Sequence, residues 1–208
     1  MTDESKYSRH TYSYLALRRA VGCIAMLLPF ALMLGEYIIF GGKIIPKSIS
    51  HYYYLGMGDV FVGALCAIGL FLFFYSGYDK WDDWAGNIAG FFAIGVALFP
   101  TGASGQSYVI GKIHDVCAVL LFIMLTVFSL FLFTKKAPEP TRRKLVRNKI
   151  YIICGLIMAA CIISVALYSN FFSTAYPDSR LVFISETVAL IAFGVSWLVK
   201  GETLLHDE

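Results

Sequence analysis

Six apolar stretches run along the chain, separated by short polar segments. Each is close to the ~20 residues that a helix needs to cross a hydrocarbon core of ~30 Å. Lipid offers no partner for unpaired backbone groups, so these stretches are expected to be helices. The pattern therefore predicts an all-α, polytopic membrane protein, with residues 1–208 forming one domain of six transmembrane helices. The spans are expected at about 17–40, 57–77, 84–101, 114–134, 149–169 and 181–199.

The composition agrees with this membrane class. Hydrophobic residues make up 58% of the chain and charged residues only 15%, whereas a soluble domain carries about 25% charged residues. The first apolar stretch is too long for the core of a signal peptide, and no small-residue cleavage site follows it. We therefore expect it to be retained as the first span.

Lysine and arginine are distributed unevenly between the two sides of such a bundle. Thirteen lie on the side of both termini and four on the other side, which predicts that both termini are cytoplasmic. The basic run Lys135–Lys149 could be a nucleic-acid patch or an anionic-lipid site. A charge signal that orients a short loop is the simpler interpretation, so no nucleic-acid partner is expected. The expected location is the cell membrane (inner or plasma), with a eukaryotic endomembrane as the alternative.

Small residues indicate where helices approach closely. Gly86 and Gly90 form a small-xxx-small pair in the third stretch, which predicts a central position for that helix. Asp59, Gly63 and Ala67 share one face of the second helix, so Asp59 is expected to point toward protein. Small-residue faces could also join two copies of the chain in a homo-oligomer.

Ionisable residues interrupt the apolar runs at the non-cytoplasmic end of the predicted spans. Such groups are costly at membrane depth, so they are usually paired, turned inward and functional. The loop between the first two spans adds a serine and a second histidine. The candidate ligand-binding residues are Glu36, Ser50, His51, Asp59, His114, Asp115 and Glu186.

Each candidate also has a simpler interpretation. Asp59 and Asp115 lie in the first turn of a helix, where a carboxylate is favoured by free N–H groups. Glu36 could reach the membrane interface, and His114 could be an interfacial histidine. Glu186 lies about one turn inside its helix, where capping explains it less well, so a buried and paired carboxylate is favoured.

A zinc site is the alternative interpretation of this cluster. His51, Asp59, His114 and Glu186 supply the nitrogen and oxygen ligands that zinc accepts. The chain has neither HxxxH nor HExxH, the spacings that place two histidines on one helical face. No cofactor is therefore expected in the main interpretation.

Short motifs in the order found here resemble a six-span family that includes the damage-regulated autophagy modulators. Related GPI-anchor-remodelling and phosphoinositide-linked membrane proteins, and bacterial relatives of unknown function, belong to it too. The resemblance implies six helices, cytoplasmic termini and a role connected with membrane lipids, and it reaches Ser50, Asp59, Asn87, His114 and Glu186. The matching motifs are IIPKSIS (44–50), Asp59 with Gly63, NIAG (87–90), HDVCAVLLF (114–122) and SETVALIAFGVSW (185–197).

Ser50, Asp59 and His114 are also similar in kind to the zinc-dependent residues of alkaline ceramidases and adiponectin receptors. That match lacks a histidine pair and a seventh span. The leading hypothesis is a membrane protein that binds a lipid headgroup or small polar ligand at its outer mouth. The alternatives are an intramembrane metal-dependent lipid hydrolase and a small proton-coupled transporter.

Overall fold

The computed structural model describes residues 3–42, 45–77, 79–102, 108–135 and 141–202. The elements within these ranges are helical and include no β-strand, which confirms the all-α prediction. A 3-10 helix, η1 (Ile49–Tyr54), precedes α2, and the π-helical turns η2 (Phe128–Leu132) and η3 (Tyr168–Phe172) extend α4 and α5. The α-helices are α1 (Asp3–Phe40), α2 (Gly58–Phe73), α3 (Lys80–Leu98), α4 (Tyr108–Val127), α5 (Arg142–Leu167) and α6 (Leu181–Lys200).

Four of the helical segments are long and apolar enough to cross a membrane, which supports a helical membrane protein. They are Leu15–Phe40, Tyr108–Leu132, Arg142–Phe172 and Leu181–Lys200. The α2 helix is apolar but has only 16 residues. The α3 helix, of 19 residues, begins with Lys80 and carries Asp82 and Asp83 in its first turn. Each of the six predicted stretches nevertheless coincides with a helix.

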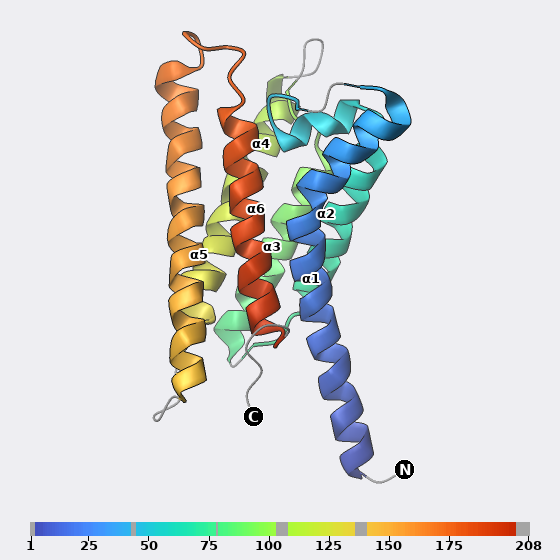
Figure 1. Ribbon diagram of the computed structural model, residues 1–208, viewed down its shortest axis with the longest axis vertical. Coiled ribbons are helices and arrows are strands. Elements are labelled where there is room, and N and C mark those ends of the chain that lie inside the picture. Colours follow the sequence, from blue (N-terminus) through green and yellow to red (C-terminus); the bar gives the residue numbers. More distant parts are fainter. Residues whose placement is uncertain (1–2, 43–44, 78, 103–107, 136–140, 203–208) are drawn as a thin grey trace.

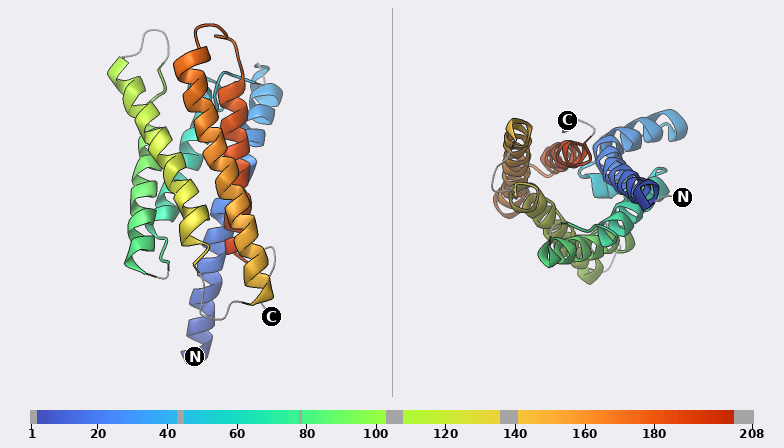
Figure 2. Two further views of the ribbon diagram at one scale, coloured as in Figure 1. Left: turned by 90° about the vertical axis from the view of Figure 1, so that its left-hand side faces the viewer. Right: turned by 90° about the horizontal axis from the view of Figure 1, so that it is seen from below.

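The helices follow one another around a ring, and α6 closes it by packing against α1. Figure 1 shows α1 and α6 side by side, and the axial view in Figure 2 shows the ring. Both ends of the chain lie at one end of the bundle, here called the inner end. The outer end is the opposite one, where η1 lies with the starts of α2, α4 and α6. The central position predicted for α3 is wrong, because α3 packs chiefly on its neighbours α2 and α4.

Glycines permit the closest helix contacts in this ring. A Cβ added at Gly86 would lie 2.7 Å from the Leu72 carbonyl oxygen, and one at Gly90 would lie 2.8 Å from that of Gly69. The small-residue face of α3 is thus used against α2 within one chain. Between α1 and α6, a Cβ on Gly194 would lie 2.7 Å from the carbonyl oxygen of Gly22. Backbones this close leave no room for a side chain.

The best-packed core lies in the inner half of the bundle. Trp197 contacts the rings of Tyr75, Phe128 and Phe133 at centroid distances of 5.3, 5.9 and 5.4 Å. Beside this cluster the hydroxyl oxygens of Ser129 and Ser196 are 2.6 Å apart, joining the end of α4 to α6. Aromatic contacts of this kind favour tilted and edge-to-face geometry, as observed here.

The outer half of the bundle is more open on the α5 side. None of the residues of α5 beyond Met158 is buried, and neither is any residue of η3. Figure 2 shows α4 leaning away from α5 and α6 toward the outer end. Side chains on these outer segments therefore have few protein neighbours, whereas the inner halves of the same helices are packed.

Candidate functional site

The structure places all seven candidate residues in elements at the outer end. Glu36 lies near the end of α1, while Ser50 and His51 belong to η1. Asp59 lies in the first turn of α2, with His114 and Asp115 in α4 and Glu186 in α6. The candidates differ, however, in what each side chain contacts.

Glu186 connects α6 to the first loop. Its Oε2 atom accepts a hydrogen bond of 2.6 Å from the backbone N–H of Ile49, the first residue of η1. The backbone N–H of Phe183 donates to the Lys47 carbonyl oxygen at 3.1 Å, which adds a second link. Glu186 shares a helical face with the buried Ala189 and Phe193, so its carboxylate points toward the bundle interior. The expected pairing of Glu186 is thus made with a backbone amide, while the residue as a whole is partly exposed.

Glu36 holds the other end of the same loop. It is only 4% exposed, and its Oε2 atom accepts from the backbone N–H of Met57 at 3.1 Å. Met57 precedes the first residue of α2, so the carboxylate satisfies a helix-start N–H group. A Cβ on Gly42 would lie 2.5 Å from Oε1 of Glu36, so the chain folds back tightly over this side chain. The Glu36 side chain is therefore enclosed by protein and paired with a backbone donor.

The η1 helix is also bonded within the loop and to its surroundings. The Ser48 hydroxyl lies 2.7 Å from Nδ1 of His51, and the Tyr54 hydroxyl donates to the Thr101 carbonyl oxygen at 2.5 Å. Ser50 is buried. Burial, with the charge of Glu36, raises the pKa of Tyr52 to about 12. These hydrogen bonds and the burial of Ser50 fix η1 at the outer end of the bundle.

The charge of His114 on α4 acts on His51 of the first loop. His114 is 2% exposed, and its Nδ1 atom lies 2.6 Å from the Phe99 carbonyl oxygen. A carbonyl oxygen only accepts, so Nδ1 carries the proton and Nε2 is left for another interaction. Burial, followed by the charges of Lys47, His114 and Arg180, lowers the pKa of His51. His51 is therefore favoured in its neutral form.

Asp115 brings a second carboxylate toward Glu186. Its position on α4 shares a face with Phe122 and Thr126, and Ser129, one turn further, contacts α6. Asp115 is exposed, and its charge acts on both His114 and Glu186. To other described residues it makes no hydrogen bond and no ion pair. The charge of Asp115 on α4 thus acts on the carboxylate of Glu186 on α6.

Asp59 does not join this group. Its predicted direction toward protein is wrong, because Asp59 is exposed and a Cβ on Gly63 would meet nothing within 4 Å. The buried stripe of α2 lies on the other side of the helix and consists of Phe61, Leu65, Ile68 and Leu72. Burial of these large apolar side chains outweighs the packing that small residues offer.

The structure does not bring the predicted zinc ligands into the donor geometry that zinc needs. Among the described residues, no three His, Cys, Asp or Glu side chains come close enough together to hold a metal ion. His51 and His114 are neighbours, but Asp59 points away and Glu186 already accepts from Ile49. These residues do not fit a structural or catalytic zinc site with three or four protein ligands.

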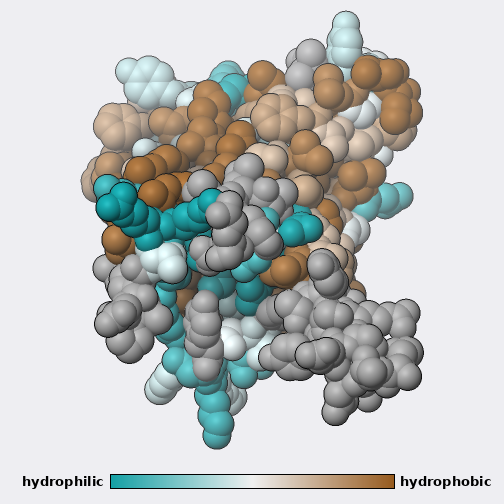
Figure 3. Space-filling model, turned by 60° about the horizontal axis from the view of Figure 1, so that its bottom comes forward, coloured by the Kyte–Doolittle hydropathy of each residue, from teal (hydrophilic) through white to brown (hydrophobic). Residues whose placement is uncertain are grey.

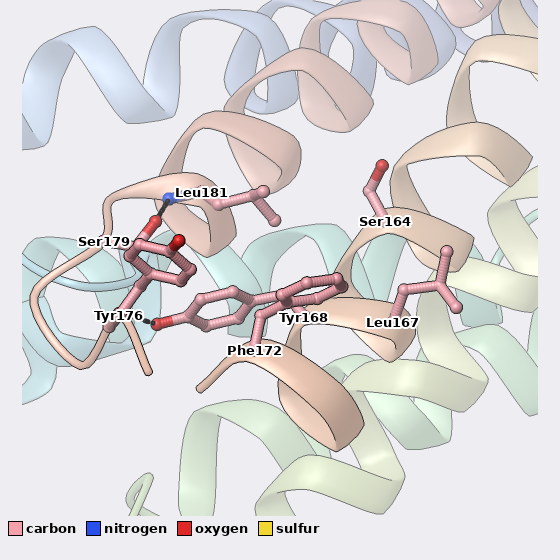
Figure 4. Close-up of a pocket in the computed structure, with 7 residues that line it drawn as sticks. All are labelled: Ser164, Leu167, Tyr168, Phe172, Tyr176, Ser179 and Leu181. Carbon is pink, nitrogen blue, oxygen red and sulfur yellow. Dashed lines mark hydrogen bonds between the residues drawn. The ribbon is translucent and has the colours of Figure 1, made fainter. Parts of the chain in front are cut away.

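A pocket that the sequence interpretation missed lies between the end of α5 and the start of α6 (Figure 4). Its volume is about 350 Å³. The Tyr168 hydroxyl donates to the Tyr176 carbonyl oxygen at 2.8 Å across it. The sequence pattern that could have indicated this pocket is an aromatic residue at every fourth position, at Tyr168, Phe172 and Tyr176. The lining residues are Ser164, Leu167, Tyr168, Phe172, Tyr176, Ser179 and Leu181.

Comparison of the chain with family models, with curated proteins and with solved structures gives no match. The resemblance to the six-span family therefore stays an expectation. Functional argument for this chain rests on the geometry of its own residues.

Proposed function

We propose that all six helices span the membrane, with the inner end and both termini in the cytoplasm. The support is the coincidence of six helices with six apolar stretches, together with the excess of lysine and arginine at the inner end. The short α2 helix would cross with help from the turn that follows it. The cell membrane is the proposed location.

We further propose that the outer end binds a lipid through a positively charged ammonium group. The observation that carries this proposal is that two acidic residues of the outer end, Asp115 on α4 and Glu186 on α6, lie near enough for the charge of Asp115 to act on Glu186. An ammonium group offers hydrogen-bond donors to both carboxylates and reduces their mutual repulsion. A free phosphate in the same place would be repelled.

The surroundings of the carboxylate pair suit a whole phospholipid headgroup. Lys47 and Arg180 act electrostatically on His51 at the rim, so positive charge lies outside the carboxylates. A zwitterionic headgroup has the matching order, with its phosphate following its ammonium group. The unburied outer half of α5 offers a route by which a lipid can reach the site from the bilayer.

The test is thermal unfolding of the detergent-purified protein with two short-chain lipids of equal chain length. Dioctanoyl phosphatidylethanolamine should stabilise the protein more than dioctanoyl phosphatidylglycerol, which keeps the phosphate and replaces the ammonium group by hydroxyls. Asp115→Asn should remove the difference. Asp59→Asn is the matched control, because it neutralises an outward-facing carboxylate at the same end.

Equal stabilisation by the two lipids would overturn the proposal, as would an unchanged preference in Asp115→Asn. Glu186→Gln provides a second variant. Its amide oxygen can still accept from the Ile49 N–H group, so the link to η1 is kept while the charge is removed. Loss of the lipid preference with a normal unfolding temperature would support the assignment.

A further inference from the structure

Basic side chains from three helices gather inside the inner end of the bundle. Arg18 comes from α1, Lys144 and Arg147 from α5, and Lys200 from α6. Arg147 is 8% exposed and Lys200 is 7% exposed, which is unusual for cations. Figure 3 shows hydrophilic side chains collected on this end, with hydrophobic surface beyond them. The group therefore differs from loop charges that only orient a membrane protein.

An aromatic cluster lies directly beside these cations. Three of the four place their charge over a ring at a distance typical of cation–π contacts. The contacts are Arg18 over Tyr75 at 5.5 Å, Lys144 over Tyr151 at 5.7 Å and Lys200 over Phe133 at 5.4 Å. The cations lie over the faces of these rings. This arrangement places like charges near one another.

Positive charge is in excess around Lys200. The groups whose charges act on it are three cations, Arg18, Lys144 and Arg147, and one acid, Asp82. Asp82 is fully buried and also accepts a hydrogen bond of 2.6 Å from the Lys135 ammonium group. Cations therefore outnumber acids among the groups whose charges act on Lys200. An added anion would therefore be attracted to this group.

A buried N–H group supplies the second, independent observation. Trp197 is 1% exposed, and its indole Nε1 atom has no hydrogen-bond partner among the residues that the structure describes. The indole packs against Phe133, the ring beneath the Lys200 ammonium group. An indole N–H only donates, so what it lacks is an acceptor. The basic side chains and the Trp197 indole N–H group can all donate hydrogen bonds to a ligand with several acceptor oxygens.

We propose that the inner end binds a phosphate group, held by Lys200, Lys144, Arg18 and Arg147 above the aromatic cluster. A phosphate has the charge and the several acceptor oxygens that donors from three different helices can share. Its source is an anionic lipid of the cytoplasmic leaflet or a soluble phosphate ester. This site is independent of the ammonium site proposed at the outer end.

The experiment measures thermal unfolding of the full-length protein in detergent as dioctanoyl phosphatidic acid or inorganic phosphate is titrated. Phosphatidic acid should raise the unfolding temperature of the natural sequence in a saturable way. In Lys200→Met the concentration for half the effect should rise about tenfold, as expected for loss of a charged hydrogen-bond partner. The unfolding temperature of the same variant without ligand gives the baseline from which its response is measured.

Lys149→Met is the matched control. Lys149 is exposed on α5, near the same end of the bundle, and its loss changes the net charge equally. The control should keep the phosphatidic acid response within about twofold. Equal weakening in both variants would show general attraction of an anion to a basic surface and would overturn the proposal, as would no response in the natural sequence.

Lys144→Met is a second variant if Lys200→Met does not fold, and it should weaken the response as well. The two titrants separate the sources of the phosphate. Stabilisation by inorganic phosphate that Lys200→Met weakens supports a soluble phosphate ester. Stabilisation by phosphatidic acid alone supports a lipid.

Discussion

The two ends of this bundle handle buried charge in opposite ways. At the outer end, Glu36 and Glu186 are carboxylates, and each accepts a hydrogen bond from a backbone N–H group of the first loop. At the inner end, the buried Lys200 and the partly buried Arg18 and Lys144 lie over aromatic rings, and the buried carboxylate of Asp82 pairs with Lys135. The outer charges therefore fasten a segment of chain, whereas the inner charges lie on a packed core.

This difference reflects what each end has available as a partner. The outer end has a loop whose 3-10 helix and following α2 helix begin with unsatisfied N–H groups, and carboxylates satisfy them. The inner end has Trp197 and its neighbouring rings, whose faces attract cations without supplying an opposite charge. The two glutamates are thus paired with backbone donors, whereas these cations lie over ring faces.

The largest expected effect comes from the inner core. Trp197→Ala should lower the free energy of unfolding by about 3–5 kcal/mol, because it leaves a cavity among packed rings. Trp84→Ala removes the same side chain at a position that is 64% exposed. The control should change stability by less than about 0.5 kcal/mol. Denaturant unfolding in detergent measures both, and similar losses would contradict the contrast between core and surface.

The next effect concerns the hydrogen bond between Glu186 and the first loop. Glu186→Ala leaves the Ile49 N–H group without its acceptor, which should cost about 1–3 kcal/mol. Glu186→Gln keeps an acceptor oxygen and should recover most of that loss. Hydrogen exchange at the Ile49 amide gives the local measurement: it should speed up in the Ala variant and stay slow in the Gln variant. Unchanged exchange in Glu186→Ala would contradict the fastening role.

A smaller effect should appear as a pH dependence of the outer end. Burial and neighbouring cations hold the pKa of His51 below its unfolded value of 6.5. The neutral form is therefore favoured by folding, and this contribution is present above pH 6.5 and lost as the pH falls toward the folded pKa. His51→Gln should make the unfolding temperature less sensitive to acidification between about pH 7.5 and 5.5. An equally steep decline in both proteins would assign the pH effect elsewhere.

The smallest effect is expected for the exposed ion pair at the outer rim. Lys47 and Asp178 are 3.5 Å apart, with side chains 51% and 90% exposed. Lys47→Met should change the free energy of unfolding by about 1 kcal/mol or less, because water screens such a pair. Lys135→Met at the inner end should cost more, since its partner Asp82 is fully buried. A larger fall in unfolding temperature for Lys47→Met than for Lys135→Met would contradict this difference between the two ends.

Much of the architecture was predictable, because hydrophobic stretches of about 20 residues in a low-charge chain permit few alternatives to helices. The close contact of α3 through Gly86 and Gly90 also follows from its small residues, although the helix contacted could not be read from them. The direction of Asp59 was mispredicted. Glycine and alanine spacing indicates a possible contact, but the large apolar stripe of α2 decides which face is buried.

The candidate site was only partly predictable. Acidic residues inside apolar stretches indicated paired carboxylates, and Glu36, which is buried, and Glu186, which is partly buried, are such groups. Their partners, the N–H groups of Met57 and Ile49, could not be foreseen because backbone donors leave no mark in the sequence. For the inner cations, the charge pattern of the sequence indicates only a role in orienting the chain. Only helix rotation distinguishes Lys200, turned inward over Phe133, from the exposed Lys149.

The sequence by itself determined the helical class, the order of the helices and the end at which each ionisable residue lies. These follow from local hydrophobicity and from distance along the chain. Tertiary packing brings the first loop to both glutamates and the basic residues to the aromatic cluster, and it places Asp115 where its charge acts on Glu186. Such contacts depend on the rotation of each helix about its axis, and that rotation is set by packing against neighbours distant in the sequence.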